Sequence, residues 1–461
     1  MTESSFSSLK LPKQQLTNLK SLGYHTMTPI QAKSLPVVLT GKDLIAKAKT
    51  GSGKTAAFGI GLLNKIQPRL FRIQGLVMCP TRELATQVAK ELRRLARYQH
   101  NIKILTICGG QPIGPQIGSL QHGAHIVVGT PGRLKDHLRK DTIDLNKVHT
   151  LVLDEADRML DMGFYDDIRQ IILQTPIQRQ TLLFSATYPD KIRELSDDFQ
   201  TQPKEVSVEA LHSNSQIQQH LYAVDNHSQK DQALLTLLGI HQPSAAVIFC
   251  NTKQLCNQIS KQLRDNGYSA LALHGDQEQR ERDQTLVQFA NQSCRFLIAT
   301  DVAARGLDID DLPMVINYDL PRDAKVFIHR IGRTGRAGKM GQAISLLAQS
   351  EAYKREAIEE ALKTTLNPQP LPETVEDPQR PPAPPMVCLC IAGGRKDKVR
   401  PGDILGALTG DAGIDGEAVG KIDIFDYVAY VAIERTQADK ALGRLLNGKI
   451  KGRKFKLRKL N

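Results

Sequence analysis

The residues best suited to chemistry begin with a glycine-rich segment near the N-terminus. Ala48-Lys49-Thr50-Gly51-Ser52-Gly53-Lys54-Thr55 follows an apolar run that predicts a strand and precedes a run that predicts a helix. In that setting backbone amides and the helix N-terminus bind phosphates, while Lys54 neutralises charge and Thr55 reaches Mg²⁺. The segment therefore predicts a nucleoside triphosphate loop, in a variant form because Ala48 stands where the strict pattern has glycine. A chance glycine-rich turn is the alternative.

A second group of reactive side chains, Asp154-Glu155-Ala156-Asp157, follows the apolar run 150–153. Carboxylates at the carboxyl end of a parallel strand, beside a phosphate loop, are placed for metal and water chemistry. We expect Asp154 to hold Mg²⁺ and Glu155 to orient and deprotonate the attacking water. The alternative is an ordinary helix N-terminus, where acidic residues are favoured.

The elements that must position these residues alternate between short apolar runs and helical stretches. Strands are predicted at 43–46, 75–79, 103–108, 125–128, 150–153 and 181–184, and a further series at 245–250, 269–273, 295–299, 314–317 and 342–347. This rhythm predicts βαβ units. The fold class is therefore α/β, with two tandem parallel-sheet lobes of five or so strands each.

The C-terminal part of the chain has a different composition. Residues 367–385 contain eight prolines, which disfavour helix and central strand. Beyond them the apolar runs predict the order βαββαβ, the layout of an RNA-recognition motif. We therefore divide the chain into a first, ATP-binding lobe (1–206), a second lobe (207–366), a proline-rich linker (367–385) and an RRM-like RNA-binding domain (386–461).

Charge and cysteine content narrow the functional classes. The net charge is +13, of which residues 386–461 carry +6, and this favours a polyanionic partner such as RNA. A solvated basic surface is the alternative for the basic tail. The seven cysteines include no CxxC pair, so we expect buried, reduced thiols. No apolar run is long enough for a membrane span. These features predict a cytoplasmic protein that does not bind membranes. The sequence has no long hydrophobic surface helix of the kind that implies an obligate oligomer, so we expect a monomer.

The order of the motifs resembles the DEAD-box family of superfamily 2 RNA helicases across residues 6–350, and this resemblance implies that the two tandem parallel-sheet lobes are RecA-like. Gly23-Tyr24 and Thr28-Pro29-Ile30-Gln31 are similar to the family's Q motif, although Met27 stands where the family usually has proline. The resemblance implies that Gln31 reads the adenine edge and that Tyr24 stacks on its ring. It also implies an ATP site formed by Phe6, Tyr24, Gln31, Thr50, Gly51, Ser52, Gly53, Lys54, Thr55 and Asp308, with Thr55 and Asp154 holding Mg²⁺.

Further motifs resemble the family's RNA contacts and its coupling elements. The implied RNA contacts in the lobes are Thr81, Arg82, Gly110, Thr130, Arg133, Arg282 and Thr300. Ser185, Thr187 and His329 are the implied coupling residues. The resemblance makes Arg333 and Arg336 arginine fingers that join Lys54, Asp154 and Glu155 as catalytic residues, whereas a plain patch for RNA phosphates is the alternative for this arginine-rich loop.

The C-terminal unit resembles the RNA-binding domain of the DbpA-type subfamily, which recognises a hairpin of large-subunit ribosomal RNA. The resemblance lies in 391–395, 400–410 and 448–453. Tyr427 and Tyr430 are the only aromatic residues near its third strand, and the first strand has none. We therefore expect basic side chains to contact RNA, among them Arg395, Lys396, Lys398, Lys449, Lys451, Arg453 and Lys454.

Together these features predict an ATP- and Mg²⁺-dependent RNA helicase that separates short duplexes. Its expected partners are 23S-type ribosomal RNA and the precursor of the large ribosomal subunit. An ATP-gated RNA clamp or chaperone without duplex separation is the main alternative, and a translocating DNA helicase is a third.

Overall fold

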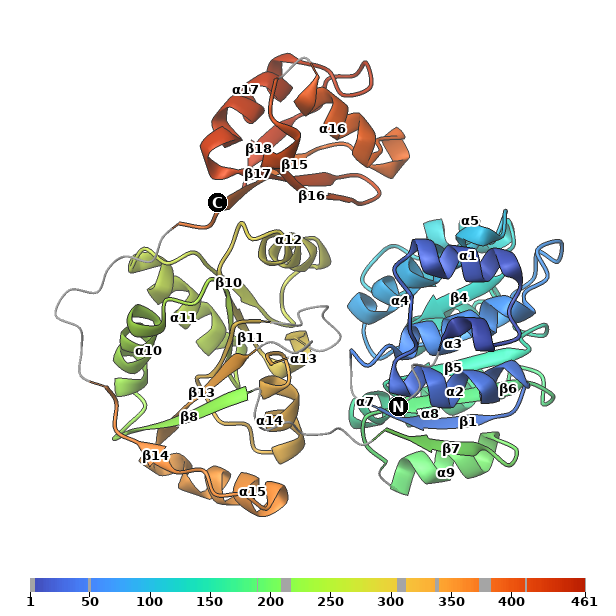
Figure 1. Cartoon of the computed structure of the whole chain (residues 1–461), viewed down its shortest axis with the longest axis horizontal. Coiled ribbons are helices and arrows are strands. Elements are labelled where there is room, and N and C mark those ends of the chain that lie inside the picture. The colour runs from blue at the N-terminus through green and yellow to red at the C-terminus, as the bar shows by residue number, and fades with distance from the viewer. Residues whose placement is uncertain are drawn as a thin grey trace. The chain divides into compact units, whose positions relative to one another are not determined.

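The computed structural model describes residues 5–48, 51–188, 190–208, 217–304, 312–335, 340–372, 383–410 and 413–460. Two compact units contain residues 5–208 and 217–460 of this described part. Three β-sheets organise the chain, two in the lobes and one near the C-terminus (Figure 1). The first two sheets have seven strands each and the third has four.

The first lobe is built on a wholly parallel sheet with the strand order β3-β4-β2-β5-β6-β1-β7. Its strands are β1 (Leu44–Lys47), β2 (Gly75–Met78), β3 (Ile104–Ile107), β4 (Ile126–Gly129), β5 (Thr150–Asp154), β6 (Gln180–Ser185) and β7 (Lys204–Ser207). Its helices are α1 (Lys13–Ser21), α2 (Pro29–Leu39), α3 (Lys54–Lys65), α4 (Arg82–Leu95), α5 (Gly114–Gln121), α6 (Pro131–Arg139), α7 (Ala156–Asp161), α8 (Tyr165–Ile172) and α9 (Asp190–Phe199).

Helices cover both faces of this sheet, which explains why its central strands are apolar throughout. On β2, Val77 packs into one hydrophobic cluster with helices α3 and α4, whereas Leu76 and Met78 pack into another with α7 and α8. A strand that is buried on both faces has no side in contact with solvent, so its sequence is a continuous hydrophobic run. Since the strands are parallel, the connections that follow them all lie at one edge of the sheet.

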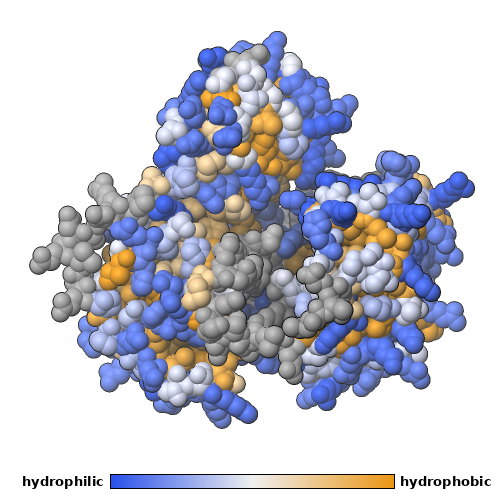
Figure 2. All heavy atoms as spheres, viewed as in Figure 1, coloured by the Kyte–Doolittle hydropathy of each residue, from blue (hydrophilic) through white to orange (hydrophobic). Residues whose placement is uncertain are grey.

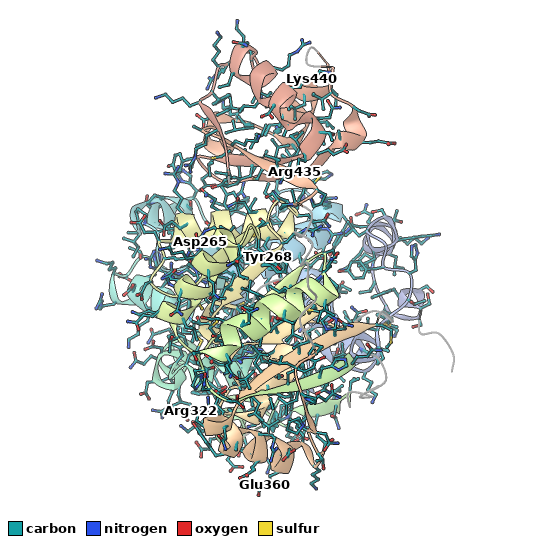
Figure 3. All side chains as sticks on the ribbon, turned by 90° about the vertical axis from the view of Figure 1, so that its left-hand side faces the viewer. Asp265, Tyr268, Arg322, Glu360, Arg435 and Lys440 are labelled. Carbon is teal, nitrogen blue, oxygen red and sulfur yellow. The ribbon has the colours of Figure 1, made fainter. Side chains whose placement is uncertain are left out.

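The second lobe repeats this topology with the order β10-β11-β9-β12-β13-β8-β14. The strands are β8 (Ile217–Val224), β9 (Ala246–Phe249), β10 (Ala270–Leu273), β11 (Phe296–Ala299), β12 (Met314–Asn317), β13 (Gly341–Ala348) and β14 (Pro368–Gln369). The helices are α10 (Gln229–His241), α11 (Lys253–Asp265), α12 (Gln279–Ala290), α13 (Asp301–Ala304), α14 (Ala324–Ile331) and α15 (Ala352–Leu362). Tyr268, just after α11, packs its ring against Phe296 in this core (Figure 3).

The parallel-sheet prediction is confirmed, but each lobe has more strands than the sequence predicted. The sequence did not predict β7, β8 and β14, which lie at or next to a sheet edge. β14 falls within the segment 367–385, for which proline content argued against central strands. Pro368 is compatible with β14 because this strand pairs on one side only, with β8. The sheet of the second lobe therefore extends to Gln369, beyond the predicted boundary at 366.

The C-terminal domain has the predicted order βαββαβ around an antiparallel sheet. Its main elements are β15 (Met386–Ile391), α16 (Pro401–Thr409), β16 (Val419–Ile424), β17 (Ala429–Glu434), α17 (Ala438–Asn447) and β18 (Leu457–Lys459). Both helices pack on one face of the sheet. Arg435, labelled in Figure 3, donates from Nε to the carbonyl of Pro384 at 2.6 Å and so fixes the start of the domain.

Two further expectations concern the surface and the cysteines. All seven cysteines are buried and free, as the sequence predicted. In the part of the chain that the structure describes, no helix is both long and apolar enough to cross a bilayer. Figure 2 shows mainly hydrophilic side chains on the visible face of each part, with small hydrophobic patches between them.

Candidate active site and RNA-binding surfaces

The phosphate loop lies between β1 and α3, as predicted. Gly51 and Gly53 have φ values of +79° and +93°, which glycine adopts without strain, and α3 begins directly at Lys54. Lys54 is buried, and its ammonium group donates to the carbonyl of Ala48 at 3.2 Å. This geometry leaves backbone amides at a helix N-terminus beside a buried cation, which suits a polyphosphate. Thr50 lies outside the described residues.

The Q-motif residues hold this loop from the side. Gln31 accepts a hydrogen bond from the amide of Thr28 at 2.9 Å and donates to the carbonyl of Gly53 at 3.1 Å. The Thr28 hydroxyl donates to the carbonyl of Ser52 at 2.8 Å. A Cβ on Gly53 would lie only 2.5 Å from the Gln31 amide nitrogen, so this approach requires glycine. In this structure Gln31 therefore supports the loop that was expected to bind phosphate.

The aromatic residues expected at the adenine have structural partners. Phe6 is buried and packs edge-on against Tyr24, with ring centroids 6.1 Å apart. The hydroxyl of Tyr24 donates to Glu91 of α4 at 2.8 Å. These contacts hold Phe6 and Tyr24 against each other, while Gln31 contacts Thr28 and Gly53.

The acidic quartet begins at the carboxyl end of β5. Asp154 is 3% exposed, and its Oδ1 atom has no hydrogen-bond partner among the described residues. Burial raises the pKa of Asp154 to about 6, although the charge of Lys54 opposes the shift. Glu155 is also buried, and it adopts the left-handed conformation with φ +53°. Such a conformation costs a non-glycine residue about 1–3 kcal/mol, and strained residues of this kind cluster at active sites. Arg158 lies 3.4 Å from the Glu155 carboxylate.

This donor set fits a Mg²⁺ ion that arrives with a nucleotide. Mg²⁺ in nucleotide sites takes one or two protein oxygens and fills its remaining positions with phosphate and water. The Oδ1 atom of Asp154 and the hydroxyl of Thr55 would supply the protein oxygens. Among the described residues no cluster of three or more His, Cys, Asp or Glu side chains could hold a metal by itself. When bound, the ion would neutralise phosphate charge.

Asp157 is a functional candidate that the sequence reasoning did not assign. Its Oδ2 atom accepts hydrogen bonds from the backbone amide and the hydroxyl of Thr187, each at 2.9 Å. Ser185 donates to the Thr187 carbonyl at 2.6 Å, and its own carbonyl accepts from the amide of Ala48 at 2.9 Å. The acidic quartet, the segment 185–187 and the start of the phosphate loop are therefore connected. The sequence could have indicated this role, because Asp157 is the last residue of the acidic quartet.

The first-lobe residues expected to contact RNA follow β2, β3 and β4, which are neighbours in the sheet. Thr81 caps α4, and the guanidinium of Arg82 occupies the space that a side chain at Gly110 would need. Arg133 donates to the carbonyl of Gln111 at 3.0 Å. Thr130 is the residue before α6. Hydroxyls, guanidinium groups and a bare glycine backbone thus converge, and these groups bind phosphate oxygens without reading bases.

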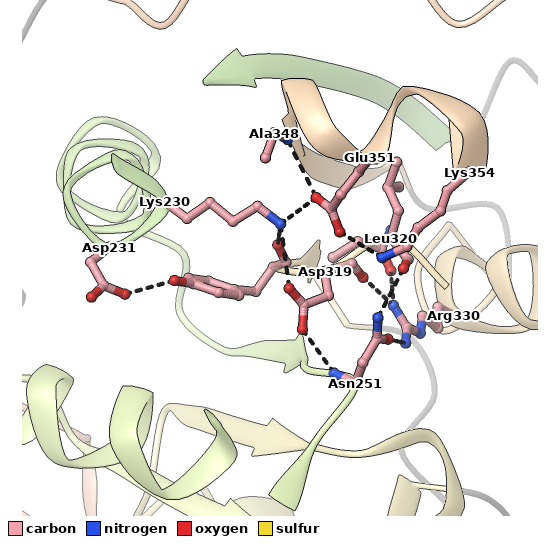
Figure 4. A network of polar contacts seen from close by, with 11 residues as sticks. Lys230, Asp231, Asn251, Asp319, Leu320, Arg330, Ala348, Glu351 and Lys354 are labelled. Carbon is pink, nitrogen blue, oxygen red and sulfur yellow. Dashed lines mark hydrogen bonds and ion pairs between the residues drawn. The ribbon is translucent and has the colours of Figure 1, made fainter. Parts of the chain in front are cut away.

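In the second lobe, a buried polar network organises the corresponding edge (Figure 4). Arg330 of α14 is 1% exposed and donates to both oxygens of Asp301, at 2.6 and 2.8 Å. Its other donors reach the side chains of Asn251 and Asn317 and the carbonyl of Asp319. Arg330 lies in the segment 329–336, for which the sequence predicted roles at His329, Arg333 and Arg336 only. Arg330 lies on the amphipathic helix α14, three residues before Arg333, and this position could have indicated a role from the sequence.

A buried lysine completes this network. Lys230 of α10 is fully buried and donates to Glu351 at 2.6 Å, to the Tyr318 carbonyl at 2.8 Å and to Asp319 at 3.3 Å. The other oxygen of Asp319 accepts from the amide of Asn251 at 3.0 Å. Glu351 also accepts from Lys354 at 2.7 Å. Each buried charge here has partners of opposite charge, as Figure 4 shows.

The remaining second-lobe candidates lie around this network. Arg333 is buried just after α14, and His329 lies on the last turn of that helix. Thr300 precedes α13, and Arg282 of α12 donates to the carbonyl of His274 at 3.3 Å. Asp308 and Arg336 lie outside the described residues.

In the C-terminal domain two basic turns lie side by side. Lys451 donates to the carbonyl of Lys398 at 2.9 Å, which joins the segment after residue 448 to the turn that contains Arg395 and Lys396. Lys449, Arg453 and Lys454 are exposed in the first of these turns. Gly394 passes so close to the carbonyls of Phe425 and Asp426 that a Cβ would collide with them. Tyr430, one of the two tyrosines noted in the sequence, packs edge-on against Phe425.

Comparison with known proteins agrees with this geometry. The sequence patterns of three families match: DEAD/DEAH box helicase at residues 28–195, Helicase conserved C-terminal domain at 229–338, and DbpA RNA binding domain at 388–459. The ATP-dependent RNA helicase DbpA of Escherichia coli is 54% identical over 461 residues, which cover 99% of each chain. The chain belongs to the DEAD-box family of ATP-dependent RNA helicases.

Other DEAD-box helicases match the two lobes. The DEAD-box ATP-dependent RNA helicase CshA of Bacillus subtilis is 43% identical over 362 residues, covering 78% of this chain and 73% of that protein. The structure of Saccharomyces cerevisiae Dbp5 bound to RNA and ADP BeF3 aligns with a TM-score of 0.72 and 31% identity, covering 79% of this chain and 96% of that one. The DEAD-box helicase described here therefore has RNA helicase activity that depends on ATP hydrolysis.

Proposed function

We propose that this DEAD-box helicase acts on 23S-type ribosomal RNA during assembly of the large ribosomal subunit, as a cytoplasmic monomer. The supporting observation is the contact between Lys451 and the carbonyl of Lys398, which gathers two basic turns of the C-terminal domain into one surface. The match of this domain to the DbpA RNA binding domain supports the same target. RNA substrate choice then resides in the C-terminal domain.

The lobes are suited to a substrate of any sequence. Their RNA candidates present hydroxyls, guanidinium groups and backbone amides, which grip phosphates. Arg82 stacks into the space above Gly110, and Arg133 is tied to the backbone of Gln111. Neither arrangement resembles a paired donor and acceptor set aimed at a base edge. A preference for one RNA must therefore come from another part of the chain.

For ATP hydrolysis we propose that Lys54, Thr55 and Asp154 hold the nucleotide with Mg²⁺, and that Glu155 is the general base. Asp154 binds a cation only when ionised, so its raised pKa should fall when the site is occupied. The backbone conformation of Glu155, with Arg158 beside its carboxylate, fixes where that carboxylate points. Arg333 and Arg336 are proposed to stabilise charge on the transferred phosphoryl group.

Removal of the C-terminal domain tests the proposed division of labour. The truncation should follow Pro372, because Pro368 and Gln369 form β14 and belong to the second lobe. We expect the truncated enzyme to keep RNA-stimulated ATPase activity with bulk RNA and to lose preferential stimulation by ribosomal RNA. If the preference persists, substrate choice resides in the lobes and the proposal is wrong.

Substitutions in the intact protein separate recognition from charge. Lys449→Ala with Arg453→Ala removes two exposed cations from the basic turns, whereas Lys421→Ala with Lys440→Ala removes the same charge elsewhere in the domain. The first pair should weaken binding of a ribosomal hairpin more than binding of a scrambled hairpin at the same salt concentration. Both pairs should have equal effects if only net charge matters.

A further inference from the structure

The connection between α3 and β2 lies at the amino edge of the first-lobe sheet, opposite the edge that carries the ATP and RNA motifs. The side chain of Gln74, 1% exposed, closes this loop with three hydrogen bonds. It accepts from the amide of Gln67 at 2.9 Å and donates to the carbonyls of Gln67 and Leu70 at 3.0 and 2.8 Å. The loop therefore has a fixed shape.

A neighbouring connection braces the same loop. The Nδ1 atom of His125 accepts from the amide of Lys103 at 3.0 Å, so Nε2 carries the proton and donates to the carbonyl of Pro68, also at 3.0 Å. The His125 ring lies against Phe71, with centroids 4.7 Å apart. Gly123 has φ +72°, and a Cβ there would approach the Phe71 carbonyl to 2.7 Å.

This braced loop displays apolar and basic side chains to solvent. Phe71 is 49% exposed and Leu70 is 38% exposed. Arg69 and Arg72 flank them and are both exposed. Among the described residues neither guanidinium group makes a hydrogen bond or an ion pair. An apolar ring between two unpaired arginines, on a loop held by buried hydrogen bonds, is a surface prepared for a ligand.

Basic side chains continue along this edge of the sheet. Lys147 is exposed in the connection before β5, and Lys65, His149 and Arg179 line a surface pocket of about 360 Å³ further along. The position of Lys65 at the end of α3 is explained by the helix dipole, which favours cations there. That explanation does not extend to Arg69 and Arg72, which lie in a loop.

Few acidic groups offset this charge. Asp43 is buried, and its two oxygens accept from the amides of Thr181 and Thr201, both at 2.7 Å. Asp144 accepts from the amide of Asn146 at 2.9 Å. Asp141 is exposed in the same connection as Asp144. The edge is therefore predominantly cationic around Phe71.

We propose that the loop Gln67–Gln74 is a second RNA-binding site, which takes unpaired nucleotides of the same substrate outside the segment held by the helicase motifs. Phosphates would pair with Arg69 and Arg72, and a base would stack on Phe71, as aromatic side chains do in single-strand-binding proteins. An acidic protein would satisfy the charges but would make no use of the ring in this way. The four-residue strand β2 separates the two edges by about 13 Å, so different nucleotides occupy them.

The test uses the full-length protein and two oligouridylates, one of about 10 nucleotides and one of about 40, since single-strand sites cover about 4–16 nucleotides. The short RNA is too short to occupy two single-strand sites at once, and its engagement of the helicase motifs is measured by stimulation of ATPase activity. We expect Arg69→Ala with Arg72→Ala to weaken binding of the long RNA about 10-fold. The slope of log affinity against log salt should become less steep by about 1.4, because each lost phosphate contact in a single strand contributes about 0.7.

Phe71→Ala should weaken binding of the long RNA at least about 5-fold without changing the salt slope, because stacking releases no counterions. Lys13→Ala with Lys20→Ala removes equal charge from α1, and Tyr353→Ala removes an exposed ring from α15, so these are the matched controls. For every variant the ATPase activity stimulated by the short RNA should equal that of the wild type, which shows that the fold and the helicase motifs are intact.

Two results would overturn the proposal. Unchanged long-RNA affinity in all three substitutions would exclude an RNA site, and if polyglutamate then bound wild type but not Arg69→Ala with Arg72→Ala, the loop would be a site for acidic proteins. Equal losses for long and short RNA would show that the substitutions act on the helicase motifs. Failure of the proposed ribosomal target would appear separately, because oligouridylate contains no ribosomal hairpin.

Discussion

The two lobes share one strand order, counted from the first strand of each sheet, yet they treat buried charge in opposite ways. In the first lobe Asp154 is buried with one carboxylate oxygen lacking a partner and with a raised pKa. In the second lobe Lys230, Glu351, Asp301 and Arg330 are paired with opposite charges. The same fold therefore holds a poised site in one copy and a satisfied network in the other.

This difference separates residues that wait for a ligand from residues that hold loops in place. A buried charge without full compensation destabilises the folded lobe until a ligand arrives. A buried charge with several partners fixes the segments from which those partners come. In the second lobe these segments contain Asn251, Asp301 and Asp319, which follow β9, β11 and β12. We therefore expect substitution of Glu155 to affect turnover and substitutions within the network of Lys230 and Arg330 to affect stability.

The largest effect should follow Glu155→Gln. Removal of a general base typically lowers the rate by about 10² to 10⁴-fold. The amide keeps the size of the side chain, so ATP affinity should stay within a few-fold of wild type. Steady-state ATPase rates and equilibrium binding of a fluorescent ATP analogue measure the two quantities. A turnover near the wild-type rate would remove Glu155 from the catalytic role.

Lys230→Met should have the largest effect on stability. It leaves Asp319 buried without its cation and Glu351 with Lys354 alone, and breaking a buried ion pair costs about 3–5 kcal/mol. Hydrogen exchange of peptides from the second lobe should report this loss while peptides from the first lobe remain protected. Lys261→Met, at an exposed position of α11, is the control. Equal protection in both variants would mean that the network does not support the lobe.

The lobes should also respond oppositely to acid. The pKa of Asp154 is raised to about 6 from 3.8, so the folded first lobe binds this proton more tightly than the unfolded chain. Its ionisation thus destabilises the metal-free first lobe by roughly 3 kcal/mol above pH 6, and the penalty disappears as pH falls towards 4. Asp154→Asn should be the more stable protein at neutral pH and should match wild type near pH 4.

The pKa of Glu351 is shifted in the opposite direction to that of Asp154. Its burial favours the neutral form, but hydrogen bonds from Lys230 and Lys354 lower its pKa below the ordinary value of 4.5. The ionised Glu351 therefore stabilises the folded second lobe above pH 4.5, and this stabilisation is lost as the pH falls below 4.5. Hydrogen exchange corrected for intrinsic rates can follow both lobes in one sample. Parallel pH responses of the two lobes, in nucleotide-free and metal-free protein, would contradict the comparison.

The smallest predicted effect concerns the link between Asp157 and Thr187. Thr187→Val removes one hydrogen bond to a carboxylate, a loss of about 1.5–3 kcal/mol, and leaves the backbone bond in place. We expect duplex separation to fall several-fold more than ATP turnover, because the link connects the acidic quartet to the segment 185–187. Thr187→Ser keeps the hydroxyl and should restore separation. Equal losses of both activities would assign Thr187 to hydrolysis itself.

Much of the fold was predictable because buried parallel strands have continuous apolar sequences. β2, β4 and β9 are such strands, and each was predicted close to its observed bounds. The edge strand β7 was missed because exposed Lys204 and Glu205 give it no apolar run. β8 was missed because three polar residues, Gln218, Gln219 and His220, follow Ile217 and interrupt its apolar run. The phosphate loop and the acidic quartet could be predicted since each is a local sequence pattern.

The second-lobe network could not be predicted in the same way. Lys230 is 121 residues away from Glu351 and 89 residues away from Asp319, and a lysine in the first turn of a helix usually lies in solvent. The contacts of Gln31 also could not be predicted from the sequence. The motif indicated its chemistry, but only the structure shows that both ends of its amide bind the chain, at Thr28 and Gly53.

The short strand β14 also has a consequence for how the C-terminal domain delivers RNA. Pairing with β8 fixes the chain as far as Gln369, and Arg435 fixes it again at Pro384. Leu371 also packs against the second-lobe core, so the tether is residues 372–383, which span at most about 43 Å when fully extended. One RNA held within that radius has an effective concentration at the lobes on the order of millimolar. The lobes can then bind RNA weakly and release it quickly without losing their substrate.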